Sequence, residues 1–482
     1  MYSKWFYFKN IKNLFIPSLL SNVNIICNKK HVRREFKLVR PPTEKNICLR
    51  CKGARNLCGK QTCPILLKSS ILKKVVPFKI GKTEKNVELF GASPPGFFVG
   101  RYNYPNVNIG PLVPFEEFQL DKPSQSFKDS HILDAPELWY GKRMQDIISY
   151  RSSMVRNNFK MNVKIQQPKL KTTPSLKEQR FLERSQLLSM AARPVDTETK
   201  LRKMRLGMTM DNHALPIGPT GKTEKLRIVE NVKVHPKVDY CVSDTDLNAQ
   251  EAISEYLYLD GKVPLSIIQR IFSAGLLGEK KRRKLVPTRW SITAIDDMIS
   301  KKLIEEIKKF PEINDYRIFE ATYLDNHFKI LLFPGKFLFE MNEVWAPDSL
   351  WNRKINGVQQ ITQPQIMTDY EFYRGRTSYA NNITGAYYAA RKSVCEYLYR
   401  IRRQARVLIF REVSGGYVVP LGVWVIRETV KNAMNQKPEV LDNFQTSLGQ
   451  MAHGLMIDLK YWKHSSKIID FIQEQRTLDD FI

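Results

Sequence analysis

Four cysteines near the N-terminal end of the chain restrict what that region can fold into. Cys48, Cys51, Cys58 and Cys63 lie within sixteen residues, and the first two form a C-x-x-C pair. A tight turn of this kind presents two thiolates to one side of a metal ion, and a second pair completes a tetrahedron. Four thiolates suit a structural Zn²⁺ ion with no open coordination position. The sequence therefore predicts a small zinc module with four cysteine ligands in residues 41–88.

Disulfide bonds and an iron–sulfur cluster are the other arrangements that four cysteines allow. A long basic chain without a secretory signal indicates a reducing compartment, which disfavours disulfides. The knuckle-like pairing favours zinc over iron–sulfur, although the second pair is spaced more widely than in the usual zinc ribbon. We therefore expect Zn²⁺ as a structural cofactor, in a protein of the cytoplasm that associates with the nucleoid of a prokaryote.

The net charge of +29 points to a polyanionic partner. Residues 1–90 hold 20 Lys and Arg against 4 Asp and Glu, so this part carries +16 of the total. We interpret residues 1–40 as a basic, disordered extension and exclude them from the fold. No apolar run reaches the roughly 18 residues that a membrane span needs, so we expect no stable membrane insertion. DNA is the predicted partner, and RNA is the weaker alternative.

Residues 89–116 are too rich in Gly, Pro and Asn to form a long helix. Two short strands are expected here, around a turn at Asn103–Asn106. Arg101, Asn103 and Asn108 are candidates for contact with phosphates or base edges. The alternative is a packed β-turn module whose aromatic residues belong to the core.

Basic residues elsewhere extend the candidate nucleic-acid surface, and each has a structural alternative. Arg151 and Arg156 follow a predicted helix, and the alternative is that they satisfy the end of this helix. Lys281, Arg282 and Arg283 form a basic run before a Pro-Thr-Arg-Trp stretch that contains Arg289, and the alternative is a solvated loop. Arg402 and Arg403 lie at the end of a helix rich in tyrosine, and the alternative is a buried helix whose cations extend to solvent.

The pattern of strand and helix signals predicts an α+β fold, with mixed, mostly antiparallel sheets and packed helices. We assign residues 89–462 to this core, with a polar linker near 157–174 that divides it into two subdomains. Strands are expected at 316–324, 329–333 and 337–344, and a hairpin at 407–426.

Asp244 and Asp246 are the first carboxylates to test for metal-assisted hydrolysis with Mg²⁺ or Mn²⁺. The alternative interpretation of Ser243–Asp246 is a helix N-cap. The catalytic residues, if there are any, stay unknown at this point.

The last eight residues follow the spacing Q-x-x-φ-x-x-φ-φ, with Gln475, Leu478, Phe481 and Ile482 at the marked positions. One turn of helix would point the apolar side chains in the same direction, as in peptides that dock into a groove. The spacing matches the PIP motif, which binds the sliding clamp of DNA replication (PCNA). A terminal helix that packs on the protein's own body is the alternative. The second apolar position is Ile482 rather than an aromatic residue. We treat residues 463–482 as a tail that carries this motif.

Several blocks of the sequence together resemble the archaeal Nre family of DNA repair proteins. They include the cysteine blocks Cys48-Leu-Arg-Cys51 and Cys63-Pro-Ile, Ser93-Pro-Pro-Gly-Phe-Phe-Val-Gly-Arg101, Val107-Asn-Ile-Gly-Pro-Leu112, Trp139-Tyr-Gly, Arg151-Ser-Ser, Ser243-Asp-Thr-Asp246, Leu285-Val-Pro-Thr-Arg-Trp-Ser-Ile-Thr293 and Leu421-Gly-Val-Trp-Val-Ile-Arg-Glu428. The resemblance covers about residues 45–482. It implies that the four cysteines are the family's zinc motif and that the tail contacts the clamp.

These observations support three hypotheses. The first is a DNA repair factor that binds DNA and is recruited to the clamp by its tail. The second is a metal-dependent nuclease or nucleotide-processing enzyme recruited by the same tail. The third is an RNA-binding protein, since zinc knuckles and high charge also suit RNA.

Overall fold

The computed structural model describes residues 83–114, 127–167, 174–205, 215–346 and 364–474, and single residues between them: Cys63, Leu66, Leu67, Ser69, Ser70 and Gly207. Residues 1–46 and 47–482 separate into two units. All described residues lie in the second unit. The structure does not describe Cys48, Cys51 and Cys58, nor the residues of the PIP motif. The predicted zinc module and tail therefore stay predictions. Among the described helices, none is both long and apolar enough to cross a membrane.

The first sheet has the strand order β1-β5-β6-β4-β3-β2. Its strands are β1 (Thr83–Ser93), β2 (Phe97–Val99), β3 (Asn106–Pro114), β4 (Met154–Asn162), β5 (Val195–Arg205) and β6 (Thr220–Ile228). β4 runs parallel to β6, and the other neighbours are antiparallel. One face packs Val107, Ile109 and Met161 into the large core of the protein.

The second sheet has the order β10-β9-β11-β8-β7-β12. Its strands are β7 (Tyr316–Tyr323), β8 (Asn326–Phe333), β9 (Leu338–Trp345), β10 (Ile366–Glu371), β11 (Arg406–Val413) and β12 (Glu439–Leu441). Only β9 and β11 are parallel among its described pairs. The predicted α+β fold with mixed, mostly antiparallel sheets is confirmed for the described residues.

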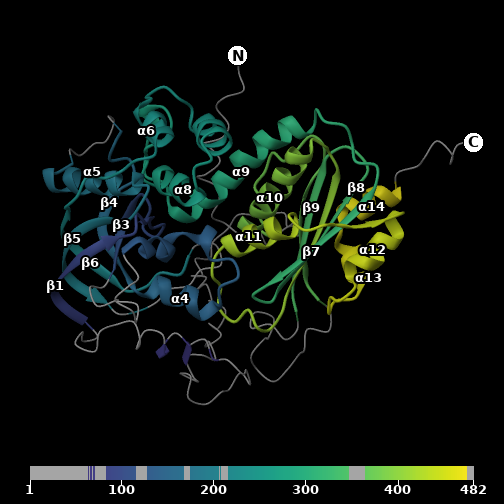
Figure 1. Cartoon of the computed structure of the whole chain (residues 1–482), viewed down its shortest axis with the longest axis horizontal. Coiled ribbons are helices and arrows are strands. Elements are labelled where there is room, and N and C mark those ends of the chain that lie inside the picture. The colour runs from purple at the N-terminus through teal and green to yellow at the C-terminus, as the bar shows by residue number, and fades with distance from the viewer. Residues whose placement is uncertain are drawn as a thin grey trace, which may run out of the picture. The chain divides into compact units, whose positions relative to one another are not determined.

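Apolar residues alternate along the central strands of the second sheet, so both of its faces are covered by helices. In β8, Ile330 and Leu332 join the large core, whereas Leu331 and Phe333 join a separate cluster with Trp462. Figure 1 shows the two helical layers on either side of this sheet. The layers are α9 (Thr288–Ile307), α10 (Gly385–Ile401) and α11 (Trp424–Ala433) on one side, and α12 (Phe444–Ala452), α13 (Leu459–Ser465) and α14 (Lys467–Glu474) on the other.

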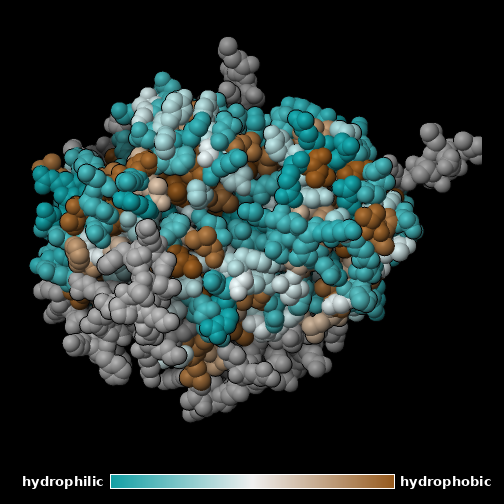
Figure 2. Space-filling model, viewed as in Figure 1, coloured by the Kyte–Doolittle hydropathy of each residue, from teal (hydrophilic) through white to brown (hydrophobic). Residues whose placement is uncertain are grey.

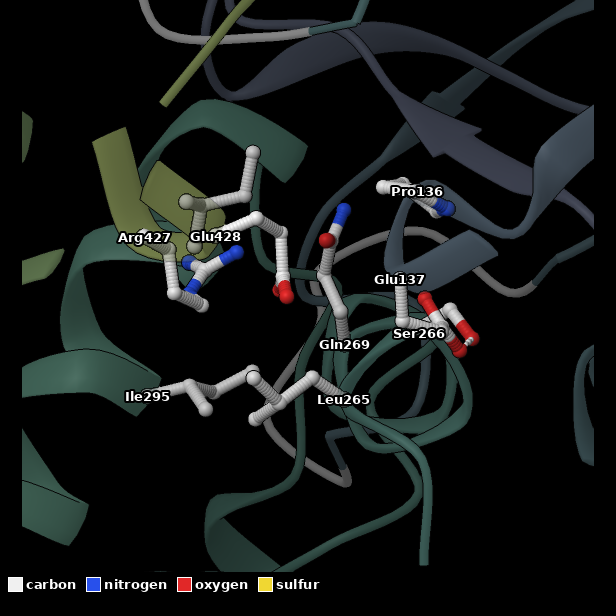
Figure 3. Close-up of a pocket in the computed structure, with 9 residues that line it drawn as sticks. Pro136, Glu137, Leu265, Ser266, Gln269, Ile295, Arg427 and Glu428 are labelled. Carbon is white, nitrogen blue, oxygen red and sulfur yellow. Dashed lines mark hydrogen bonds between the residues drawn. The ribbon is translucent and has the colours of Figure 1, made fainter. Parts of the chain in front are cut away.

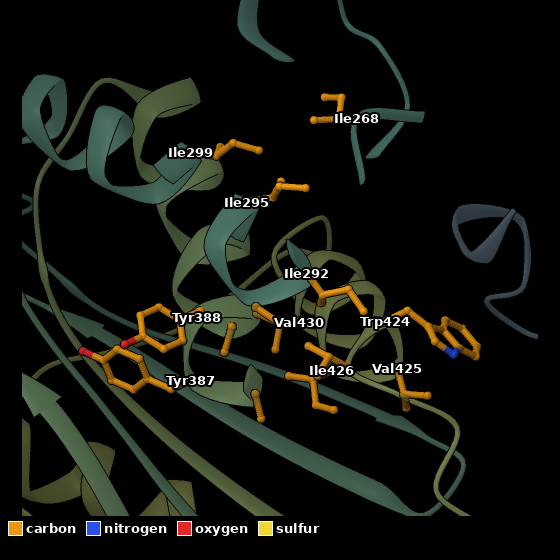
Figure 4. Packing of buried hydrophobic residues seen from close by; sticks show 14 of the residues in the cluster. Ile268, Ile292, Ile295, Ile299, Tyr387, Tyr388, Trp424, Val425, Ile426 and Val430 are labelled. Atoms are coloured by element: carbon orange, nitrogen blue, oxygen red, sulfur yellow. The ribbon is translucent and has the colours of Figure 1, made fainter. Parts of the chain in front are cut away.

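The remaining helices lie with the first sheet (Figure 1). They are η2 (Phe127–Asp134), η3 (Pro136–Leu138), α4 (Met144–Ser152), α5 (Leu176–Met190), α6 (Pro236–Ser243), α7 (Ala249–Glu251), the π-helix η4 (Ala252–Asp260), α8 (Leu265–Ser273) and η5 (Lys280–Arg282). Isoleucines of α8 and α9 meet aromatic residues of α10 and α11 in one core, which Figure 4 shows. The edge of Trp424 in α11 packs on Trp139, at a ring-centroid distance of 5.3 Å.

Two sequence-based expectations about secondary structure are wrong. The first part of the expected linker at 157–174 belongs to β4, which pairs with β3 and β6. Its polar residues misled the prediction, because Asn157 is polar but fully buried in the sheet. The expected hairpin at 407–426 is also absent, since β11 leads through a loop into α11.

Arg391 of α10 holds three elements together inside the core. Its guanidinium group makes hydrogen bonds of 3.0 Å to both carboxylate oxygens of Glu371, at the end of β10, and of 2.5 Å to Asp297 of α9. It also donates to the Ser300 hydroxyl at 3.1 Å. The Arg391 side chain is 1% exposed, so its charge depends on these partners rather than on water.

Replacing Arg391 with Met should therefore lower the free energy of unfolding by about 3–5 kcal/mol, because the buried Glu371 carboxylate would lose its counter-ion. Urea denaturation of the two proteins measures this difference. The exposed Arg180 provides a matched control, and Arg180→Met should change stability by no more than about 0.5 kcal/mol. Equal losses for the two variants would contradict the assignment of Arg391 as a buried anchor.

Candidate nucleic-acid interface

The turn between β2 and β3 meets the start of α9, although the two are far apart in the sequence. The backbone N–H of Val99 donates to the hydroxyl oxygen of Thr288 at 2.9 Å. A few residues away, the rings of Tyr104 and Trp290 lie 5.4 Å apart. Two of the sequence blocks that carry the family resemblance therefore form one continuous surface.

Polar and aromatic side chains project from this turn. Asn103 has a φ of 61°, in the left-handed region that Asn tolerates better than most residues. Tyr102 is 75% exposed, and the Arg101 guanidinium lies 5.1 Å from the centre of its ring. Asn108 is exposed, while its backbone carbonyl accepts a hydrogen bond from Gly100. The structure thus brings together the three residues that the sequence proposed here.

A second segment reaches α9 one turn further along the helix. Tyr379 has its hydroxyl bonded to Thr293, one helical turn after Trp290. Burial raises the pKa of the Tyr379 phenol, whereas the Thr293 bond and the nearby Arg289 charge lower it, and the net shift is upward. The charge of Arg289, the residue next to Trp290, therefore lies close to Tyr379. Arg289 was predicted from the sequence, whereas neither ring was.

Three of the predicted basic residues serve the interior of the fold. Arg151 is buried, pairs with Asp134 and donates to the carbonyl oxygen of Pro216 at 2.9 Å. Arg156 lies 4.3 Å from the centre of the Phe98 ring, and burial lowers its pKa to about 10. Arg283 donates to three backbone carbonyls, those of Val242, Asp244 and Gly278. These contacts stabilise local structure, so none of the three side chains points freely into solvent.

The remaining predicted cations are exposed but lie elsewhere. Lys281 and Arg282 form part of η5 and pair with Glu279. A groove of about 970 Å³ runs beside them and is lined by several glutamine side chains and Asp246. Arg402 and Arg403 follow the C-terminal end of α10, with Arg402 in the left-handed conformation at a φ of 52°. The structure does not join these two pairs to the turn at Arg101.

Asp244 has a local structural role in the loop after α6. One of its carboxylate oxygens accepts hydrogen bonds from the backbone of Asp246, at 3.0 Å, and of Leu247, at 2.9 Å. This loop precedes α7, whose N-cap is Asn248, so the predicted cap at 243–246 is displaced by a few residues. Among the described residues, no three His, Cys, Asp or Glu side chains are grouped to hold a metal ion.

A small cavity lies between η3, α8, α9 and α11. Figure 3 shows Glu137, Gln269, Arg427 and Glu428 around it. Its volume of about 30 Å³ suits one or two water molecules and is too small for a nucleotide.

Nearby, Lys392 of α10 donates to Glu396 at 2.6 Å and to the Tyr258 hydroxyl at 2.7 Å. Burial lowers the pKa of Lys392 to about 7 and raises that of Glu396 to about 8, because both charged forms have lost water. Asp296 pairs with Arg427 in the same region. This ionic cluster ties η4 and α9 to α10 and α11, and it offers no opening for a macromolecule.

Figure 2 shows the apolar residues of one face as separate patches within polar surroundings. At the candidate surface, the Arg101 guanidinium lies beside the Tyr102 ring, and the Arg289 charge lies near Tyr379. Aromatic rings with cations beside them suit nucleic acid better than an apolar partner.

Comparison with known proteins identifies the family. The model for the N-terminal part of archaeal Nre proteins matches residues 57–352, and the model for their C-terminal part matches residues 371–481. The chain belongs to the archaeal Nre family. This confirms the resemblance that the sequence blocks indicated.

Several members of the Nre family are similar to this chain over most of their length. The DNA repair protein NreA of Archaeoglobus fulgidus is 36% identical, over 86% of this chain and 95% of its own. The DNA repair protein NreB of the same organism is 35% identical, over 90% and 100%. The DNA repair protein NreA of Haloferax volcanii is 32% identical, over 81% and 89%. No solved structure matches the chain.

Proposed function

We propose that this Nre protein is a DNA repair factor that binds DNA and is brought to its site of action by the sliding clamp. The names of its relatives support the assignment to DNA repair. DNA binding is supported by the contact of the turn that carries Arg101, Asn103 and Asn108 with the start of α9, where Tyr104 packs on Trp290 next to Arg289. Cations would contact phosphates, and the aromatic and amide groups would contact bases.

Recruitment would depend on the last eight residues. The family match extends to residue 481, so it includes Gln475, Leu478 and Phe481. α14 ends at Glu474, directly before the motif. A terminal segment of this length can dock its apolar residues into a groove of the clamp while the body binds DNA.

Exchanging both Leu478 and Phe481 for Ala should weaken binding of the full chain to the clamp about a hundredfold or more, since two buried apolar side chains are lost. Isothermal titration of purified clamp measures the Kd. Thr477→Ala changes a position that the motif leaves free and should keep the wild-type Kd. Clamp binding that survives the double change would contradict recruitment through this tail.

We also propose that Cys48, Cys51, Cys58 and Cys63 hold a structural Zn²⁺ ion. The spacing of the cysteines and the reducing compartment expected for the protein support this assignment. The ion would close a small module that lacks a large core of its own.

Elemental analysis should therefore find one zinc ion per chain in the purified protein. Changing Cys48 and Cys51 together to Ser removes half of the ligands and should abolish the bound zinc. Cys27→Ser is the matched control, because this cysteine lies outside the motif, and it should leave the zinc content unchanged. Zinc retained by the double variant would refute this ligand set.

A further inference from the structure

The segment between β10 and α10 displays aromatic side chains and is firmly attached at both ends. We call residues 372–384 the aromatic loop; it reads Phe-Tyr-Arg-Gly-Arg-Thr-Ser-Tyr-Ala-Asn-Asn-Ile-Thr. Tyr373 and Tyr379 are each 40% exposed. Phe372 is also 38% exposed, so three aromatic side chains are exposed within eight residues, and such a group marks a candidate interaction site.

The first end of the aromatic loop is fixed by the buried ion pair of Glu371 with Arg391, described above. The second end is fixed by Asp369 of β10. Its carboxylate accepts backbone hydrogen bonds from Asn382, at 3.0 Å, and Ile383, at 2.7 Å, and pairs with Arg376 at 3.2 Å. Both anchoring carboxylates are nearly buried. The loop therefore has a defined conformation without any bound partner.

The backbone geometry at the end of the aromatic loop also indicates a fixed conformation. Thr384 has a φ of 58°, which is rare for a β-branched residue. Such a conformation persists only where the surroundings impose it, and it occurs most often at binding and catalytic sites.

The aromatic loop runs along α9. Lys308, which follows α9, lies 4.7 Å from the centre of the Tyr373 ring, and Lys336 lies 5.7 Å from it. At the other end, the Tyr379 hydroxyl is bonded to Thr293 of α9. Arg376 bridges the two ends by donating to the carbonyl oxygens of Tyr370, at 2.7 Å, and Tyr379, at 3.1 Å.

The exposed rings therefore follow one direction across the body. Tyr104 and Trp290 lie at the start of α9, Tyr379 follows beside Thr293, and Tyr373 lies near Lys308. Trp290 and Lys308 are separated by a span of about 27 Å along the helix. We call these four rings the stacking row. Arg289, Lys308 and Lys336 accompany it.

We propose that the stacking row binds unpaired bases of single-stranded DNA. Every base has a face that can stack on an aromatic ring, and the accompanying cations can contact the backbone phosphates. Duplex DNA would not use the rings, because its base faces are already stacked. The inference deepens the proposed DNA binding and rests on it, since it specifies the form of DNA that this surface recognises.

Fluorescence anisotropy of the full chain with labelled oligothymidine of roughly 16 nucleotides tests the inference, because this length spans the site sizes of known single-strand binders. Trp290→Ala, Tyr379→Ala and Tyr373→Ala should each raise the Kd about 5- to 100-fold. Trp290→Phe keeps a ring at this position and should retain most of the affinity. Tyr240→Ala is the matched control, because this tyrosine is 51% exposed on α6, away from the row, and it should leave the Kd unchanged.

A blunt duplex of the same length separates this inference from the broader proposal. If the wild type binds both DNAs, the three alanine variants should lose affinity for oligothymidine, and Tyr373→Ala and Tyr379→Ala should keep their affinity for the duplex. Unchanged oligothymidine binding in all three variants would overturn the stacking row, while duplex binding would still support the proposed function. A wild-type chain that binds neither DNA would overturn both. Tighter binding of oligouridine than of oligothymidine would assign the row to RNA and so contradict the inference.

Discussion

The buried guanidinium of Arg391 is the contact on which the arrangement of the candidate surface depends. It joins α10 to α9 through Asp297 and to the end of β10 through Glu371. The aromatic loop leaves β10 at the next residue, so its starting point is fixed relative to α9. An interior ion pair costs desolvation energy, and a well-packed apolar contact could hold the helices together equally well. The ion pair adds direction, because its hydrogen bonds allow only one placement of the three elements.

This rigidity has a consequence for binding. A loop that is ordered before it meets its ligand loses less conformational entropy when the ligand binds. The same holds for the turn at Arg101–Asn106, whose base is tied to α9 by the bond between Val99 and Thr288. Exposed rings held in this way can contact a flexible strand while the protein itself hardly changes shape. The flexible part of the interaction would then be the nucleic acid.

Much of the fold could be predicted from local patterns in the sequence. The strands expected at 316–324, 329–333 and 337–344 are confirmed, because strand and turn signals act within a few residues. β4 was missed because its buried polar residue, Asn157, looks like part of a linker in the sequence. The positions of Arg151 and Arg283 could not be predicted either. Their partners, Asp134 and the carbonyls near Val242, become neighbours only through the tertiary fold.

The residues of the candidate site were likewise predicted only where a local pattern in the sequence indicates them. Arg101, Asn103 and Arg289 were chosen as cations and amides near turns, and the structure places them near one another. Tyr379 was not among the predicted residues, because nothing local indicates that it lies beside Thr293. The density of aromatic and basic residues in Phe372–Tyr379 was a signal that could have been used.

DNA bound by this protein should lie across the turn at residues 101–106, the start of α9 and the aromatic loop. Hydrogen–deuterium exchange of the full chain, with and without a single-stranded oligonucleotide at saturating concentration, tests this directly. We expect slower exchange in residues 101–106 and 372–379 when DNA is bound. Protection confined to 280–283 and 402–403, with no change in those two segments, would contradict it.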